Sequence, residues 1–331
     1  MTETRLCWPE TSVPRVAPWA PWLRYIVPGT TQFLWLLANH PRLLSRMYVL
    51  EGVAEFGQFV LAANTHRDLE IVILRANWNV GHTYHFAVHA FWGLVRESVL
   101  GGPRAGRGFV AAIRQGRDAP YWNKRQAWLI RAADELHNEL AISEETVRAL
   151  RGHGYSDGEL VEFAFVVGHY GLLGMLLESA AVPAEPLIPE PAPAERPRLP
   201  RPFAKNRGGI ASPWRPGNDD TLLVHPVLRW ALPRYARSIE RVSSLDVHEL
   251  VQAARGLDPG ADPRRRVLFA AVAELYSEYV LSDTTWRQLR NHYTDAQLLE
   301  LCTLVGHLRT HEMLTGTMVS LATPGRGTRR P

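Results

Sequence analysis

A group of ionisable side chains in the first half of the chain has the composition of an acid–base or metal site. Glu70 is followed, after eleven intervening residues, by three histidines at relative positions i, i+3 and i+7, namely His82, His85 and His89. We expect Glu70 on one helix and the histidines along one face of the next, with Gly81 at the reversal between them. At about 1.5 Å of rise per residue, Glu70 and His89 then lie within about one helical turn of each other. One carboxylate should therefore face a row of imidazoles.

Three kinds of role fit this cluster. In acid–base chemistry without a cofactor, His89 exchanges a proton with the substrate, Glu70 orients the imidazole ring, and His85 or His82 supplies a second donor. As a divalent-metal site, the same four residues would bind Zn, Fe, Mn or Cu. In a structural role, the histidines form hydrogen bonds in a core or a subunit interface. The cofactor-free reaction on a small-molecule substrate is the hypothesis that we carry forward.

Three neighbouring side chains are candidates for contacts with that substrate. Arg75 has the charge to bind a substrate carboxylate, and Tyr84 and Trp78 have the size to line an apolar pocket. An arginine on a helix is more often an ion-pair partner, and aromatic residues more often pack in a core. The substrate-binding assignments compete with these ordinary roles.

Helices must position all of these residues, because apolar residues recur three and four apart and we find no convincing strand. An example is the run of apolar residues between 160 and 175. Helix starts are marked by side chains that accept a hydrogen bond from a free backbone amide. These are Thr65, Ser143, Asp262 and the capping boxes Ser156 with Glu159 and Thr294 with Gln297. The sequence therefore predicts an all-α fold.

The chain contains an internal repeat. The segment that begins at Ala132 recurs from Ala271 with one single-residue gap. A His-Pro pair at 40–41 corresponds to another at 225–226. Matched residues include Glu135 with Glu274, Ser143 with Ser282, Gly168 with Gly306 and His169 with His307. The second copy lacks the segment that carries the glutamate and the histidines. We predict a helical bundle of two related halves, with the candidate site in the first half only.

These patterns divide the chain into five parts. An N-terminal extension (residues 1–29) precedes the first helical domain (30–182). A proline-rich linker (183–220) leads to an abbreviated second domain (221–322), which we expect to wall part of the site. Residues 323–331 form a tail that we expect to be disordered.

Composition argues against nucleic-acid and membrane partners. The 37 basic and 33 acidic residues give a net charge of +4 without any basic stripe. Cys7 and Cys302 form no metal-binding or disulfide pattern, which fits a reducing compartment. The N-terminus lacks an export signal, and the most apolar window, residues 163–177, is shorter than a membrane span. We expect a cytoplasmic protein.

The segment RDLEIVILRANWNVGHTYHFAVH, residues 67–89, resembles the signature of the carboxymuconolactone decarboxylase and AhpD-like family. That signature is a glutamate, eleven residues, and then Cys-x2-Cys-x3-His, and here Glu70, His82, His85 and His89 occupy the four positions. The resemblance covers about residues 30–182 and, more weakly, 220–322. It implies an AhpD-like helical bundle, assembly into homo-oligomers and an active site at these four residues.

The resemblance also implies lyase or isomerase chemistry on a small organic acid, a lactone or a polyketide-like compound. Decarboxylation, isomerisation, dehydration and cyclisation all remain open. Histidine stands at both thiol positions, so a thiol peroxidase, which needs an attacking and a resolving cysteine, is not expected. The alternatives are a metal-dependent oxygenase or hydrolase with three histidines and one glutamate as ligands, and a non-catalytic binding or scaffold protein.

Overall fold

The computed structural model describes residue 36 and residues 39–51, 65–182 and 225–322, and every regular element in these ranges is a helix. The predicted all-α fold is therefore confirmed for the part of the chain that is described. The predicted N-terminal extension, proline-rich linker and C-terminal tail lie outside the described residues.

Helices fall before and after the predicted linker. Before it lie α4 (Pro41–Glu51), α6 (His66–Val80), α7 (Thr83–Gly101), α8 (Pro103–Gln115), α9 (Lys124–Glu139), α10 (Glu144–Gly152) and α11 (Asp157–Ser179). After it lie α12 (Pro226–Val242), α13 (Val247–Ala254), α14 (Pro263–Glu278), α15 (Asp283–Arg290) and α16 (Asp295–Ala322). We call these two groups the first and the second part of the chain.

The predicted helix starts are confirmed by hydrogen bonds at the caps. Thr65, Ser143 and Asp262 each accept a bond from a backbone amide in the first turn of their helix. Ser156 with Glu159 forms a reciprocal capping box, and so does Thr294 with Gln297. A third box, formed by Asn123 with Gln126 at the start of α9, was not predicted.

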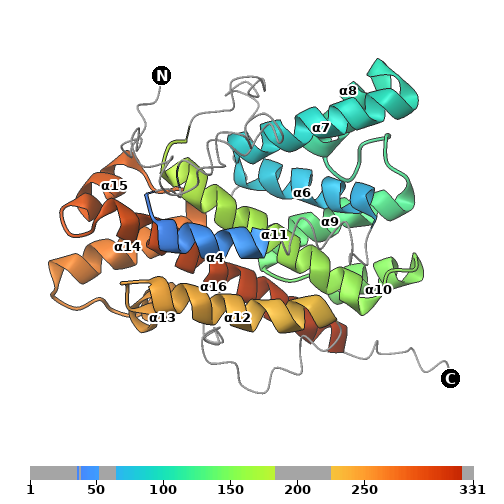
Figure 1. Cartoon of the computed structure of the whole chain (residues 1–331). Coiled ribbons are helices and arrows are strands. Elements are labelled where there is room, and N and C mark those ends of the chain that lie inside the picture. The colour runs from blue at the N-terminus through green and yellow to red at the C-terminus, as the bar shows by residue number, and fades with distance from the viewer. Residues whose placement is uncertain (1–35, 37–38, 52–64, 183–224, 323–331) are drawn as a thin grey trace.

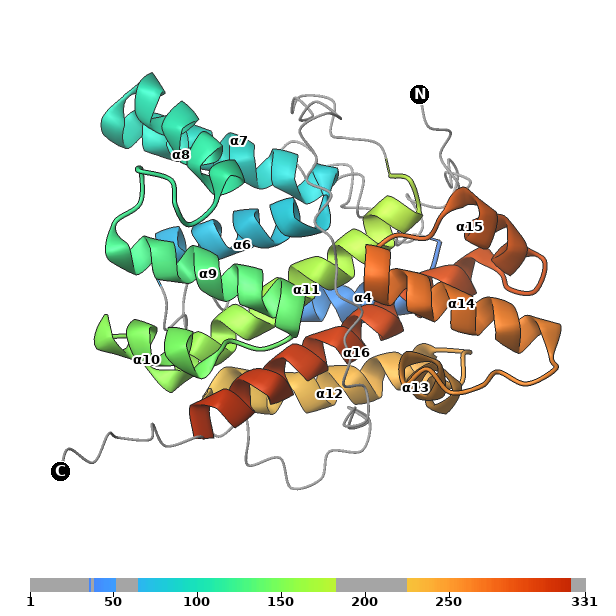
Figure 2. The same ribbon diagram turned by 180° about the vertical axis from the view of Figure 1, so that it is seen from behind.

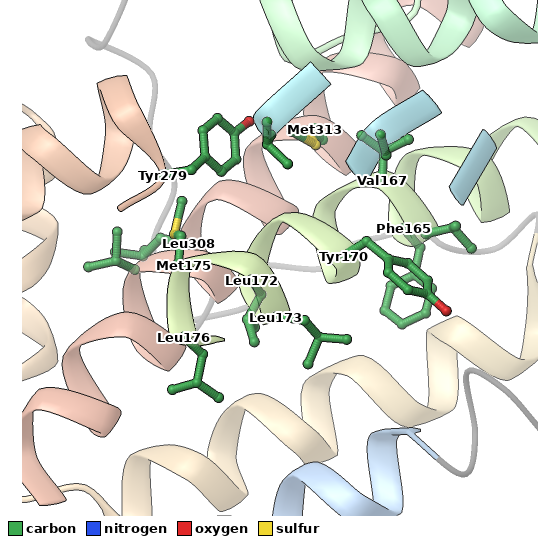
Figure 3. Packing of buried hydrophobic residues seen from close by; sticks show 14 of the residues in the cluster. Phe165, Val167, Tyr170, Leu172, Leu173, Met175, Leu176, Tyr279, Leu308 and Met313 are labelled. Carbon is green, nitrogen blue, oxygen red and sulfur yellow. The ribbon is translucent and has the colours of Figure 1, made fainter. Parts of the chain in front are cut away.

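The two parts meet along α11 and α16, which run side by side through the middle of the bundle (Figures 1 and 2). On α11, Leu172, Leu173 and Met175 are buried, as are Leu308 and Met313 on α16 (Figure 3). By length and composition α11 is apolar enough to cross a membrane, but its apolar window is completely buried inside the bundle. The apolar surface of α11 is therefore used by the core.

Glycine allows these two helices to approach closely. A Cβ atom at Gly168 would lie 2.8 Å from the backbone Cα of Thr310 on α16, and one at Gly306 would lie 2.7 Å from the Cα of Leu172 on α11. Real Cβ atoms do not approach backbone so closely, so a larger residue at either position would force the helices apart.

A buried hydrogen bond joins the start of α4 to α16. His40 Nδ1 accepts a hydrogen bond from the Leu43 amide at 3.2 Å, so the ring carries its proton on Nε2, which donates to Glu300 Oε1 at 2.7 Å. The second oxygen of Glu300 accepts the Ser244 amide at 2.8 Å and the Ser243 hydroxyl at 3.0 Å. Burial tends to raise the pKa of Glu300, but these hydrogen bonds outweigh it and hold the pKa below its usual value. This carboxylate ties three segments together.

Replacing Gly168 by alanine should destabilise the protein by about 1–3 kcal/mol, because the added methyl group overpacks the contact between α11 and α16. The free energy of unfolding in urea measures this loss. Gly152→Ala is the matched control, since a Cβ at Gly152 meets nothing within 4 Å. Equal stability of the two variants would contradict the close approach described above.

Candidate acid–base site

The candidate site is built on the hairpin of α6 and α7. Gly81 ends α6 in the left-handed conformation, with φ of 74°, which glycine adopts without strain. This reversal brings Glu70 on α6 to His89 on α7, as the spacing predicts. His89 Nδ1 lies 3.1 Å from Glu70 Oε1 and 3.3 Å from Oε2. The Glu70 side chain is 8% exposed and that of His89 is 17% exposed, so both side chains are mostly buried but keep some contact with solvent.

A tyrosine from α11 completes a chain of three side chains. The Tyr170 hydroxyl lies 2.9 Å from His89 Nε2. An ionised Glu70 can only accept hydrogen bonds, so Nδ1 of a neutral His89 carries the proton and Nε2 accepts from Tyr170. Sequence reasoning missed Tyr170 as a site residue. The repeat could have identified it, because the second copy has a leucine, Leu308, at the position equivalent to Tyr170.

His85 lies beside His89 and Tyr170, and one of its ring nitrogens makes no hydrogen bond in the described structure. Its ring centroid is 5.6 Å from that of Tyr170 and 6.5 Å from that of His89. Nδ1 of His85 is buried and has no hydrogen-bond partner in the described structure. Burial, and then the neighbouring His89, His82 and His169, lower the pKa of His85 well below its usual value. His85 is therefore neutral near pH 7 and retains a lone pair that can accept a proton or a hydrogen bond.

His82 does not share the face of His85 and His89. It precedes the first helical residue of α7 and has an extended backbone (φ −75°, ψ 106°), so the helical period does not govern its direction. Its ring occupies the space that a side chain at Gly174 would need, and it stands edge-on to Tyr279 with centroids 6.2 Å apart. The predicted row of three imidazoles thus contains two.

The first backbone amide of α7 donates its hydrogen bond to a side chain of α11, and the His82 side chain makes no capping hydrogen bond. Glu178 Oε1 accepts the Thr83 amide at 2.7 Å and the Thr83 hydroxyl at 2.9 Å. A carboxylate at a helix N-terminus is favoured by the helix dipole. This contact fixes the start of the helix that carries His85 and His89.

The described residues do not assemble the alternative metal site. Within them, no group of three or more His, Cys, Asp or Glu side chains is arranged to hold a metal ion. His82 is directed toward Gly174, and both ring nitrogens of His89 already have protein partners. The predicted four-residue ligand set of Glu70, His82, His85 and His89 therefore does not converge.

Arg75 is held by protein groups. Its Nε lies 2.6 Å and its Nη2 3.2 Å from the two carboxylate oxygens of Asp134 on α9, and its Nη1 donates to the Ile113 carbonyl at 2.8 Å. These contacts tie α6 to α8 and α9. Arg75 therefore has the ion-pair role that is ordinary for a helical arginine, and its contact with a substrate carboxylate stays a prediction.

The two aromatic candidates lie in different surroundings. Trp78 packs against Phe86 with ring centroids 5.2 Å apart, and the Arg114 guanidinium lies 5.4 Å from the Trp78 ring centroid. Tyr84 is buried beside His85, with centroids 5.2 Å apart. Of the two, Tyr84 is therefore the one that directly contacts a histidine of the candidate site.

The lowered pKa of His85 predicts an acid-sensitive contribution to stability. An unfolded histidine binds a proton as the pH falls through about 6.5, whereas His85 in the folded protein binds one only at lower pH, so this contribution is present above pH 6.5 and is lost below it. The free energy of unfolding of wild type should fall between pH 7 and pH 5. His85→Phe should show a smaller fall, and replacement of the exposed His153 by phenylalanine should leave the slope unchanged. Equal pH slopes in wild type and His85→Phe would contradict the lowered pKa.

Comparisons with known proteins give no independent assignment of this site. No protein-family model matches the sequence, and no curated protein or solved structure matches it significantly.

Proposed function

We propose that the protein is a carboxymuconolactone-decarboxylase-like enzyme that uses Glu70 and His89 for acid–base chemistry. The observation that supports this proposal is the 3.1 Å contact between Glu70 and His89 Nδ1 in a sheltered position. A carboxylate on one ring nitrogen selects the tautomer and raises the basicity of the other nitrogen. Such a histidine transfers protons near neutral pH.

The proposed substrate is a small organic acid, a lactone or a polyketide-like compound, as the resemblance at residues 67–89 implies. Decarboxylation, isomerisation, dehydration and cyclisation share one elementary step, in which a proton moves to or from a carbon or an oxygen. Neutral His85 next to Tyr170 adds a second polar group for orienting the reacting atoms. No thiol step is proposed, because the signature positions 82 and 85 hold histidine and Cys302 is buried in α16.

We further propose that both parts of the chain descend from one AhpD-like unit. Glu135 accepts the Ser143 amide at 2.8 Å, and Glu274 accepts the Ser282 amide at 2.9 Å. The helices before these caps are both followed by a left-handed C-cap residue with φ of 58°, Leu140 after α9 and Tyr279 after α14. A left-handed residue other than Gly, Asn or Asp is rare, so its recurrence at matched positions supports duplication.

Activity is testable before the substrate is identified. Candidate acids and lactones are incubated with the protein in D2O, and deuterium incorporation is followed by NMR, because a catalyst that moves a proton to or from a substrate carbon leaves solvent deuterium on that carbon. Glu70→Gln and His89→Gln should lower the exchange rate by about 10²–10⁴-fold. His153→Gln, on the surface, should exchange like wild type. Unchanged exchange in both site variants would refute the proposed function.

The metal alternative is decided on the same preparations. Elemental analysis of wild type purified without a histidine tag, and of His85→Ala, shows whether a metal is bound through this residue. Stoichiometric metal in wild type and none in His85→Ala would replace the cofactor-free proposal with a metal-dependent one.

We also propose that the protein forms a homo-oligomer through α7. The second half of this helix exposes large apolar side chains, with Trp92 at 45%, Val99 at 80% and Leu100 at 75% exposed. Exposed apolar residues grouped in this way are typical of interaction surfaces. The double variant Trp92→Glu, Val99→Glu should sediment with a lower mass than wild type. Trp230→Glu, which changes an exposed tryptophan on α12, should keep the wild-type mass, and equal masses for all three proteins would refute this interface.

A further inference from the structure

We propose that the exposed face of α12 binds to membrane surfaces that are rich in anionic lipid. Trp230, Arg234, Arg237 and Arg241 are exposed and follow one another at intervals of four, three and four residues. Residues at these intervals lie on one side of a helix, with about 4.5–6 Å of rise between successive members. We call these four residues the α12 stripe. The stripe shares no residue with the candidate acid–base site or with the exposed surface of α7.

Packing of the opposite side of α12 keeps the stripe at the surface. Leu228, Leu232, Tyr235 and Ile239 are buried in the core, and α12 runs along one outer edge of the bundle in both views (Figures 1 and 2). Buried and exposed residues of α12 recur with the helical period, which is the pattern of an amphipathic helix. The α12 stripe therefore points away from the core and toward solvent.

The three arginines of the stripe have no anionic partner in the described part of the chain. Arg234 Nη1 donates to the Trp230 carbonyl oxygen at 2.8 Å, and none of the three forms an ion pair with a described carboxylate. Glu240, the single acidic residue of α12, is exposed and forms no ion pair with them. Like charges three and four residues apart repel one another and destabilise a helix. An anionic partner would remove this repulsion.

The neighbouring helix adds positive charge. α4 contacts α12, and its Arg42 and Arg46 are exposed and pair with no described carboxylate. By comparison, Arg125 on α9, Arg151 on α10 and Arg265 on α14 each lie 2.8 Å from a carboxylate oxygen. α12 itself contains four arginines and one glutamate, a net charge of +3 in a chain whose total is +4. Positive charge is therefore concentrated at this edge of the bundle.

Trp230 and the form of this surface favour a lipid bilayer as the occupant. The Arg234 guanidinium carbon lies 4.5 Å from the Trp230 ring centroid, over one face of the ring. Single-stranded nucleic acids are bound in basic grooves with aromatic faces open to base stacking, whereas the α12 stripe lies on the outward face of a single helix. An indole at a membrane surface lies among the headgroups, where its apolar rings and its N–H both find partners. A straight row of arginines beside it meets the phosphates of lipids that lie in one plane.

This surface is not visible in the sequence as a run of charge. Each arginine of the stripe is separated from the next by two or three other residues, several of them apolar. Only the helix collects the arginines on one side, so a peripheral membrane contact was not expected from composition. The contact agrees with the expected cytoplasmic location, because the cytoplasmic leaflet carries the anionic lipids.

Vesicle cosedimentation at physiological salt tests this binding. Wild type should bind vesicles made of equal amounts of phosphatidylcholine and phosphatidylserine, should not bind phosphatidylcholine alone, and should be released by added salt. One basic residue near such a surface changes the binding constant about fivefold, so the variant Arg237→Gln, Arg241→Gln should bind about 25-fold more weakly. The variant Arg266→Gln, Arg287→Gln loses the same charge from exposed positions on α14 and α15 and should bind nearly like wild type.

The outcomes distinguish the α12 stripe from other surfaces and other partners. Both variants should keep the wild-type melting temperature, because all four positions are exposed. Equal weakening in the two variants, or no binding of wild type to the mixed vesicles, would overturn the inference. Tighter binding of wild type to single-stranded oligothymidine than to these vesicles, lost in Arg237→Gln, Arg241→Gln, would also overturn it and make the stripe a nucleic-acid surface. Loss of vesicle binding in Trp92→Glu, Val99→Glu with full binding in the α12 variant would move the membrane contact to α7. Deuterium exchange at the acid–base site is a separate readout, so the proposed function stands or falls independently.

Discussion

The structure depends on the close contact between α11 and α16. Gly168 and Gly306 remove the side chains that would separate the two helices, so the backbone of each helix packs against residues of the other. From this central position, three residues along α11 contact or make room for residues of the candidate site. Tyr170 reaches His89, Gly174 leaves room for the His82 ring, and Glu178 accepts the amide at the start of α7. A shift of α11 would therefore disturb both the contact between Tyr170 and His89 and the start of the helix that carries His89.

A tyrosine from the second part of the chain packs beside the candidate site. Tyr279, at the end of α14, stands against His82 and is stacked on His137, with centroids 5.5 Å apart. Arg309 on α16 donates to the Tyr279 hydroxyl at 2.6 Å and lies 4.3 Å from its ring centroid. A buried cation thus holds the tyrosine that packs beside His82, the residue between the turn at Gly81 and α7.

Helix α6 carries three buried charged residues, and their partners decide what each can do. Asp68 pairs with Arg125 at 2.8 Å and Arg75 pairs with Asp134 at 2.6 Å, so each of these pairs joins an arginine to a carboxylate. Glu70 instead faces His89, whose ordinary pKa lies near neutral pH. Breaking either arginine pair would leave a buried charge uncompensated, which is strongly destabilising. One helix thus combines two structural ion pairs with one pair that can exchange a proton.

The sequence alone determined the features that depend on local geometry. Helix caps at Thr65 and Ser156 follow from side chains that reach a backbone amide three residues on, and the approach of Glu70 to His89 follows from the rise of a helix and the turn at Gly81. Only the tertiary structure decided which groups meet from distant segments. The direction of His82 depends on the space at Gly174, the partner of Arg75 comes from α9, and Tyr170 joins His89 across 81 positions. Spacing within one hairpin cannot encode these contacts, because they are set by how separate helices pack.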